Sequence, residues 1–223
     1  MINIYCLSGL GADEQIFRKL EINNARLIHL PWVEYSEQDD LPNYAKRMLQ
    51  CIKEENPTIM GVSFGGMLAI EIAKLVPVKR IILVSSAKGY KEVAHFGTIV
   101  KAIVVSEVAP AFLYKMPNKV LFDRFGATTD DERELLRGIM KRSDGKFVRW
   151  AMKEIQLWKN DIVPDNVLHI HGTADQMILP QNVTPNYWIE GGSHMMVYSK
   201  AKEVSSIINN ELYMHGRVSY KAH

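Results

Sequence analysis

The stretch Gly61-Val62-Ser63-Phe64-Gly65-Gly66 places a single hydroxyl among glycines, at the junction of two apolar segments. Residues 58–62 are typical of a buried strand, and the residues from Met67 onward are typical of a buried helix. Glycines at such a junction indicate a turn so tight that neighbouring side chains would clash. The stretch therefore predicts a strand, a sharp turn with Ser63 at its apex, and a helix.

The order of strand followed by helix recurs along most of the chain. Further apolar runs typical of strands cover residues 2–7, 25–30, 79–85, 167–171 and 186–189. Patterns typical of helices cover residues 14–20, 43–54, 67–75 and 200–212. This alternation predicts an α/β fold with a mostly parallel sheet of about six strands, flanked by helices and joined by right-handed crossovers.

One long segment interrupts the alternation. Residues 87–160 show helical patterns and no convincing buried strand, and Thr129-Asp130-Asp131-Glu132 is typical of a capping box that starts a helix reaching Arg142. A further helical pattern covers residues 146–158. We therefore predict a core made of residues 1–86 and 161–223, with a helical cap of residues 87–160 inserted between two of its strands.

Composition narrows the classes of function. The 223 residues are 47% hydrophobic and carry a formal net charge of +2, which is too small to indicate a nucleic-acid surface. No run of 18 apolar residues indicates a membrane span, and the first residues resemble a strand rather than a leader, so a cytoplasmic location is expected. The two cysteines and seven histidines form no metal-binding spacing, and we expect neither a metal nor a cofactor.

Two other polar residues follow predicted strands. Asp175 lies in the segment HGTAD (residues 171–175), and His194 ends the segment GGSH (residues 191–194). Taken singly, Ser63 could be a helix cap, Asp175 a turn residue and His194 an ordinary loop histidine. Together they follow three different strands of one parallel sheet, so their side chains are expected to meet at the carboxyl edge of that sheet. His169 and His171 alternate onto one face of their strand and are interpreted as structural or supporting residues.

With LSGLGAD (residues 7–13), these motifs resemble the α/β-hydrolase superfamily over essentially the full length of the chain. The resemblance implies that Ser63 is the nucleophile, His194 the general base and then acid, and Asp175 its orienting partner. It also implies that the backbone N–H groups of Leu10 and Phe64 hold the oxyanion.

Two departures from the family pattern stand out. Ser8 occupies a position where the family often has histidine, although backbone donors do not depend on that side chain. The chain also starts at what is usually the third strand, so six strands rather than eight are expected.

The resemblance implies a serine hydrolase that cleaves a small carboxylic ester or thioester through an acyl-enzyme intermediate. An acyltransferase, a carbon–carbon hydrolase or a lyase would keep much of the same triad, and a hydrolase-fold protein that binds a ligand without turnover is a further alternative. The expected partner is a small acyl substrate, with neither nucleic acid nor membrane, and the sequence does not specify an oligomeric state.

The substrate site can be outlined only coarsely. Residues 87–160 hold fourteen lysines and arginines against nine acidic residues, which could attract an anionic acid or a coenzyme A thioester, or could form a solvated outer face. Apolar residues of this segment could line an acyl pocket or form the cap's own core: Phe96, Val105, Phe112, Leu113, Met116 and Trp158. Trp32 and Met195 are predicted to border the site.

Overall fold

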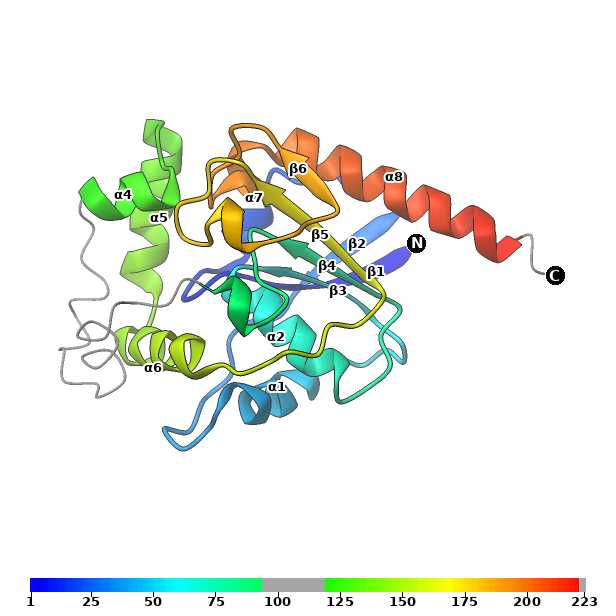
Figure 1. Ribbon diagram of the computed structural model, residues 1–223, viewed down its shortest axis with the longest axis horizontal. Helices are drawn as coiled ribbons and strands as arrows, with labels where there is room; N and C mark the ends of the chain where they lie inside the picture. The colour runs from blue at the N-terminus through cyan, green and yellow to red at the C-terminus, as the bar shows by residue number, and fades with distance from the viewer. Residues whose placement is uncertain (94–118, 221–223) are drawn as a thin grey trace.

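The computed structural model describes residues 1–93 and 119–220, with side chains up to residue 214. Its centre is a six-stranded sheet in which every neighbouring pair is parallel (Figure 1). The strands are β1 (Ile2–Leu7), β2 (Ala25–His29), β3 (Thr58–Val62), β4 (Arg80–Val84), β5 (Val167–Gly172) and β6 (Tyr187–Ile189). The predicted fold class and the six strands are confirmed.

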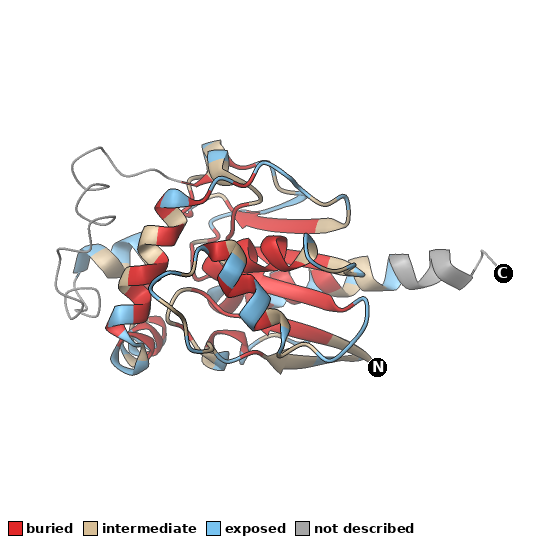
Figure 2. Ribbon diagram, turned by 90° about the horizontal axis from the view of Figure 1, so that it is seen from below, coloured by how far each residue is buried: buried red, intermediate tan, exposed pale blue. Residues whose placement is uncertain are grey.

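The sheet separates two hydrophobic cores because successive side chains of a strand point to opposite faces. In β4, Ile81 and Leu83 join the core on one face, whereas Ile82 and Val84 join the core on the other. All four side chains are fully buried, and the central strands are coloured as buried in Figure 2. A continuous apolar run is therefore required at this position, and that run made β4 recognisable in the sequence.

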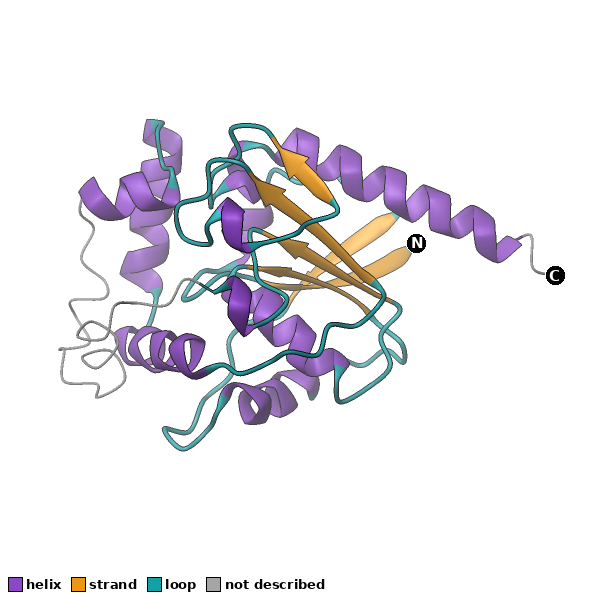
Figure 3. Ribbon diagram, in the orientation of Figure 1, coloured by secondary structure: helices purple, strands orange, loops and turns teal. Residues whose placement is uncertain are grey.

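Helices cover both faces of the sheet (Figure 3). In the view of Figure 1, α1 (Leu41–Leu49) and α2 (Phe64–Ala73) lie below the sheet, and α8 (Ala201–Tyr220) lies above it. The short helix α7 (Met196–Ser199) contributes to the same core as α8. Almost every residue of α2 is buried, so this helix lies deep in the molecule.

The strand order β2-β1-β3-β4-β5-β6 reverses direction at β1. The chain runs from β1 outward to β2 at one edge, then returns to place β3 on the other side of β1. The loops after β1 and β3 therefore diverge at the carboxyl edge of the sheet, which is where ligands bind in open α/β sheets. The glycine-rich stretches 8–11 and 61–66 both lie at this point.

A helical insertion separates β4 from β5. Its described parts are η2 (Tyr90–Glu92), α4 (Lys119–Phe125), α5 (Asp130–Arg142) and α6 (Gly145–Leu157). Thr129 forms the predicted capping box with Glu132 at the start of α5. Asp131 ties α5 to the core, since its carboxylate accepts hydrogen bonds from Lys19 at 2.7 Å and from the hydroxyl of Tyr198 at 2.7 Å. The division into a core and a cap at residues 87 and 160 stays a prediction.

Several helix boundaries differ from the expectations. Residues 14–20 form only the 3-10 helix η1 (Glu14–Phe17), and α2 starts at Phe64, directly after the serine. The helix α1 starts earlier than expected because Asp40 caps it by accepting the N–H of Asn43. The helix α8 continues well beyond residue 212. Within the described residues, no helix is both long and apolar enough to cross a bilayer.

Candidate active site

Ser63 occupies a strained turn between β3 and α2. Its φ of 53° and ψ of −120° are unusual for a residue with a side chain. A Cβ on Gly61 would lie 2.4 Å from the Gly65 carbonyl oxygen, and a Cβ on Gly65 would lie 2.3 Å from that of Leu7. Only glycine fits at these two positions, because the contacting atoms are backbone and cannot move aside.

Hydrogen bonds hold this turn from two sides. The N–H of Ser63 donates to the Val84 carbonyl at 3.2 Å, which continues the contact between β3 and β4. The hydroxyl of Ser86 donates to the Ser63 carbonyl at 2.6 Å. Ser86 was not predicted as a site residue, although its position just after a buried strand at the same edge was a usable signal.

Asp175 and His194 are brought together by the loops that follow β5 and β6. The N–H of Ala174 donates to the Gly192 carbonyl at 2.9 Å, which joins the two loops. A Cβ on Gly172 would lie 2.0 Å from the same carbonyl oxygen, so the loops approach closely only because glycine is present. This pairing explains why residues nineteen positions apart meet.

Ser63, His194 and Asp175 form a continuous hydrogen-bonded row. His194 Nε2 lies 2.9 Å from Ser63 Oγ, and His194 Nδ1 lies 2.9 Å from Asp175 Oδ2 and 3.1 Å from Oδ1. Because the carboxylate accepts from Nδ1–H, Nε2 of the neutral imidazole faces the hydroxyl as a proton acceptor. The three residues expected to meet at the edge of the sheet do so.

The carboxylate of Asp175 is buried but well partnered. Burial alone would raise its pKa, but the charge and hydrogen bond of His194, with the N–H of Ile178, hold the pKa below its usual value of 3.8. Oδ1 accepts from the N–H groups of Met177 and Ile178 at 2.8 and 3.0 Å. Asp175 therefore stays ionised at neutral pH and can stabilise a protonated His194.

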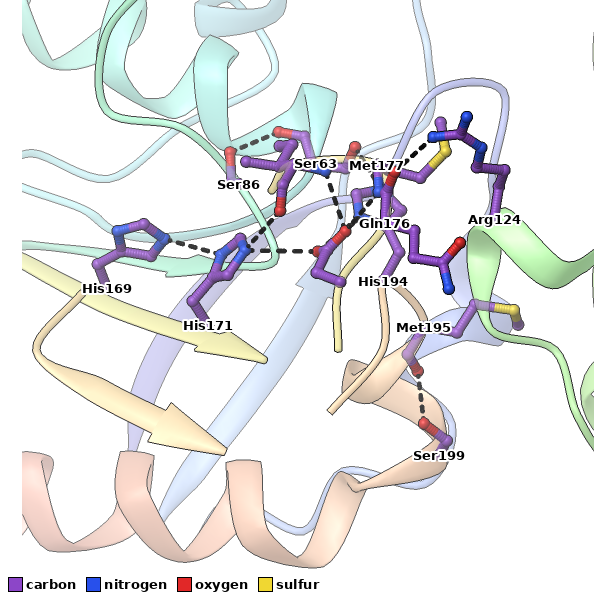
Figure 4. Close-up of polar contacts among 12 residues, drawn as sticks. Ser63, Ser86, Arg124, His169, His171, Gln176, Met177, His194, Met195 and Ser199 are labelled. Carbon is purple, nitrogen blue, oxygen red and sulfur yellow. Dashed lines mark hydrogen bonds and ion pairs between the residues drawn. The ribbon is translucent and has the colours of Figure 1, made fainter. Parts of the chain in front are cut away.

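His169 and His171 support the acid loop from the sheet. His171 Nε2 lies 2.9 Å from the Ile178 carbonyl oxygen, which can only accept, so Nε2 carries the proton. His169 Nε2 then donates to His171 Nδ1 across 3.3 Å (Figure 4). Burial lowers the pKa of both histidines, that of His169 to about 3, so the pair is neutral. Both side chains lie on one face of β5, as predicted.

A cavity of about 260 Å³ opens at Ser63 and His194. Its walls come from the glycine loop after β1, from α4, α5 and α6, and from the loops that carry Asp175 and His194. Leu10 and Met195 line the cavity, as predicted for Met195. Among the described lining residues none is Asp, Glu, Lys or Arg.

Trp32 was expected at the border of the site but does not line this cavity among the described residues. Its indole N–H donates to the Ala12 carbonyl at 2.9 Å, and the hydroxyl of Ser8 donates to the same oxygen at 2.7 Å. Trp32 and Ser8 therefore hold the glycine loop in place. Trp158 is buried elsewhere, where it donates to Glu71, and Phe96, Val105, Phe112, Leu113 and Met116 lie outside the described residues.

No family model matches the sequence, and no curated protein is significantly similar to it. Solved structures are similar in fold. A hydrolase from Oleispira antarctica superposes with a TM-score of 0.73 at 13% identity, covering 96% of this chain and 91% of the other. A lipase-esterase related protein from Clostridium acetobutylicum gives 0.68 at 16% identity, with 93% of each chain covered. A thermophilic esterase from Thermogutta terrifontis gives 0.67 at 13% identity, with 96% and 90% covered.

The chain has the α/β-hydrolase fold. Within this fold, Phe64 is the first residue of α2, so its N–H is one of the helix N-terminal donors without a partner inside the helix. Gly9 lies against the nucleophile position, since a Cβ on it would be 3.7 Å from Ser63 Cβ. The two loops expected to supply oxyanion donors thus flank Ser63.

Within residues 1–93 and 119–214, no group of three or more histidine, cysteine, aspartate or glutamate side chains is arranged to hold a metal ion. Cys6 is buried in β1, and burial raises the pKa of its thiol, so it is a packing residue. Its side chain lies in the core that contains Met60 and Val84.

Proposed function

We propose that this α/β-hydrolase is a serine hydrolase that cleaves a small, uncharged carboxylic ester or thioester through an acyl-enzyme intermediate. The observation that carries the proposal is the row in which Ser63 Oγ, His194 and Asp175 are joined by contacts of 2.9 Å at the floor of an apolar cavity. A serine paired with an oriented histidine is the arrangement that activates a hydroxyl for attack on a carbonyl.

In the first half of the reaction, Ser63 Oγ attacks the carbonyl carbon while its proton moves to His194 Nε2. The resulting imidazolium is stabilised by the ionised Asp175, and the N–H groups of Leu10 and Phe64 are assigned to the oxyanion. Loss of one such donor typically raises the barrier by about 3 kcal/mol. The intermediate then collapses, and the leaving alcohol or thiol departs with the proton held on Nε2.

In the second half, water replaces the leaving group. His194 Nε2 takes a proton from the water as its oxygen attacks the acyl carbon of the Ser63 ester. The second tetrahedral intermediate expels Ser63 Oγ, which recovers the proton from His194. The products are a carboxylic acid and the free enzyme, so one water is consumed for each ester cleaved.

The walls of the cavity favour an uncharged acyl group. Its described lining is dominated by leucine, isoleucine, valine, methionine and phenylalanine, and it includes no charged side chain. A carboxylate placed there would lose its hydration without gaining a cationic partner among the described lining residues. This argues against the anionic acyl groups that a basic cap could attract.

A fluorophosphonate probe and two matched esters test the proposal. We expect mass spectrometry to locate the adduct on Ser63, and the His194→Ala variant to lose labelling. We also expect p-nitrophenyl pentanoate to be hydrolysed with a kcat/KM at least about 100-fold above that of the p-nitrophenyl monoester of succinic acid, since an unpaired buried charge costs roughly 3 kcal/mol.

Each alternative has its own outcome. Folded protein that neither labels nor hydrolyses would be a ligand-binding protein and would overturn the proposal. Transfer of the acyl group to an added alcohol in preference to water would identify an acyltransferase. Labelling at Ser63 without ester turnover would favour carbon–carbon hydrolysis or a lyase reaction, and equal rates on the two esters would contradict the uncharged acyl site.

A further inference from the structure

The last turn of α4 ends in a glycine that reverses the chain. The N–H of Gly126 donates to the Asp123 carbonyl at 3.1 Å, and the N–H of Ala127 donates to the Phe122 carbonyl at 2.9 Å. With a φ of 72° at Gly126, these two bonds make a Schellman motif, which defines how a helix ends. The position of Phe125, the last residue of α4, is therefore set by backbone geometry rather than by a flexible loop.

This turn contacts the loop that carries His194. The Phe125 carbonyl accepts the N–H of Met195 at 3.2 Å. The Phe125 ring meets the His194 imidazole edge to face, with the ring centroids 5.4 Å apart and the planes at 77°. A Cβ on Gly126 would lie 2.2 Å from Ser193 Cβ, so a side chain at position 126 would clash with Ser193.

The same turn also contacts the loop that carries Asp175. Arg124 Nη1 donates to the Gln176 carbonyl at 3.3 Å, one residue beyond the carboxylate (Figure 4). Three consecutive residues, 124 to 126, thus contact the loops of both Asp175 and His194. These contacts reach main-chain groups of both loops, the N–H of Met195 and the carbonyl of Gln176, so they fix the backbone of the loops as well as the side chains.

We propose that this turn of the helical insertion is a positioning element for the proton relay, with Phe125 as the positioning residue of His194. The inference rests on the proposed function, because it gives Phe125 a role in that reaction. Proton transfer requires Nε2 to stay within hydrogen-bond reach of Ser63 Oγ, and a misplacement of about 1 Å can cost 100-fold in rate. The aromatic contact adds a further constraint on the imidazole, beside its hydrogen bonds with Asp175 and Ser63.

A matched control lies one turn earlier on the same helix. Phe122 is half-buried like Phe125, and its ring packs under the guanidinium of Arg137, 5.1 Å from the ring centroid. Phe122 is not among the described residues that line the cavity. Replacing either phenylalanine by leucine removes an aromatic ring from α4, but only Phe125→Leu removes the contact with His194.

The test combines kinetics with proton NMR. With p-nitrophenyl acetate, whose acyl group is too short to depend on the far walls of the cavity, we expect Phe125→Leu to lower kcat about 10- to 100-fold with little change in KM. The downfield resonance of His194 Nδ1–H, bonded to Asp175, should weaken or broaden in Phe125→Leu. Both quantities should stay at wild-type values in Phe122→Leu.

The positioning role of Phe125 and the proposed function can fail independently of each other. The NMR readout and a nuclear Overhauser contact between the Phe125 and His194 rings need no substrate, so they remain decisive if the protein proves not to hydrolyse esters. They also remain decisive if Phe125→Leu does not fold, because the Overhauser contact is measured in the wild-type chain. Absence of that contact, or equal effects of the two leucine variants, or a change confined to KM, would overturn the positioning role.

Discussion

At the scale of single residues, the site depends on a backbone conformation that costs free energy. A residue held at the φ and ψ of Ser63 costs on the order of 1–3 kcal/mol, which the surrounding fold must offset. Part of that offset comes from the bonds of Ser63 to Val84 and Ser86. In this conformation the hydroxyl of Ser63 lies 2.9 Å from His194 Nε2.

Asp175→Asn tests the assigned role of the carboxylate. The amide oxygen can still accept from Met177 and Ile178, so we expect the fold to persist. The amide would, however, stabilise the wrong tautomer of His194, and we expect kcat to fall by roughly 10³- to 10⁴-fold. The measurement is steady-state ester hydrolysis alongside thermal unfolding, with the exposed Asp165→Asn as the control. A kcat within tenfold of the wild type would mean that Asp175 is not the orienting acid.

At the level of helices and strands, aromatic side chains join α6 to the core. The ring of Phe147 lies 5.3 Å from that of Trp32, 5.7 Å from that of Tyr44 and 5.6 Å from that of Trp150. This cluster rests against Phe64, the residue that follows the nucleophile. The packing of α6 and the position of the turn at Ser63 are therefore linked.

Phe147→Ala should destabilise the whole protein, since the ring is buried and touches residues of α1, α2 and α6. We expect the free energy of unfolding in urea to fall by about 3–5 kcal/mol, the usual range for a large ring replaced by alanine in a core. Phe147→Leu retains most of the volume and should cost clearly less. A loss below about 1 kcal/mol in Phe147→Ala would show that α6 docks independently of this cluster.

At the scale of the whole molecule, acid stability depends on buried neutral histidines. His169 and His171 face each other, Lys88 lies near enough to act on His169, and Asp175 and His194 act on His171. The pKa of His169 falls from an ordinary 6.5 to about 3 in the folded chain. Between these values the unfolded chain binds a proton that the folded chain does not, so stability must fall as the pH falls.

We expect the free energy of unfolding to fall by up to about 1.4 kcal/mol per pH unit from His169 alone as the pH drops below 6.5. Asp175 adds to the loss of stability at lower pH, because its pKa in the folded chain lies below the ordinary 3.8. Its stabilising charge disappears as the pH falls through the pKa of the folded chain. His169→Gln keeps a donor for His171 and should flatten the dependence between about pH 6 and 4. Equal slopes for variant and wild type, with matching stability near pH 8, would contradict this assignment.

The local sequence pattern was sufficient to predict the strands of the sheet, because a short strand buried on both faces must be apolar at nearly every position. The β4 run could be read in the sequence since each of Ile81 to Val84 must be apolar, whichever face it points to. Helix ends were predicted less well because they depend on single capping contacts, such as that of Asp40 with Asn43. The segment 14–20 satisfied a helical pattern, yet only one short 3-10 turn forms there.

Periodicity was enough to predict the strands, and local sterics were enough to predict the sharp turn at Ser63. Three contacts became visible only in the folded chain: Trp32 supports the glycine loop, Ser86 holds the Ser63 carbonyl and Phe125 meets His194. Those contacts join segments that are 20 to 69 residues apart in the chain, and their geometry follows from how the loops dock against the sheet. No local pattern encodes that docking, since it depends on the packing of all the elements at once.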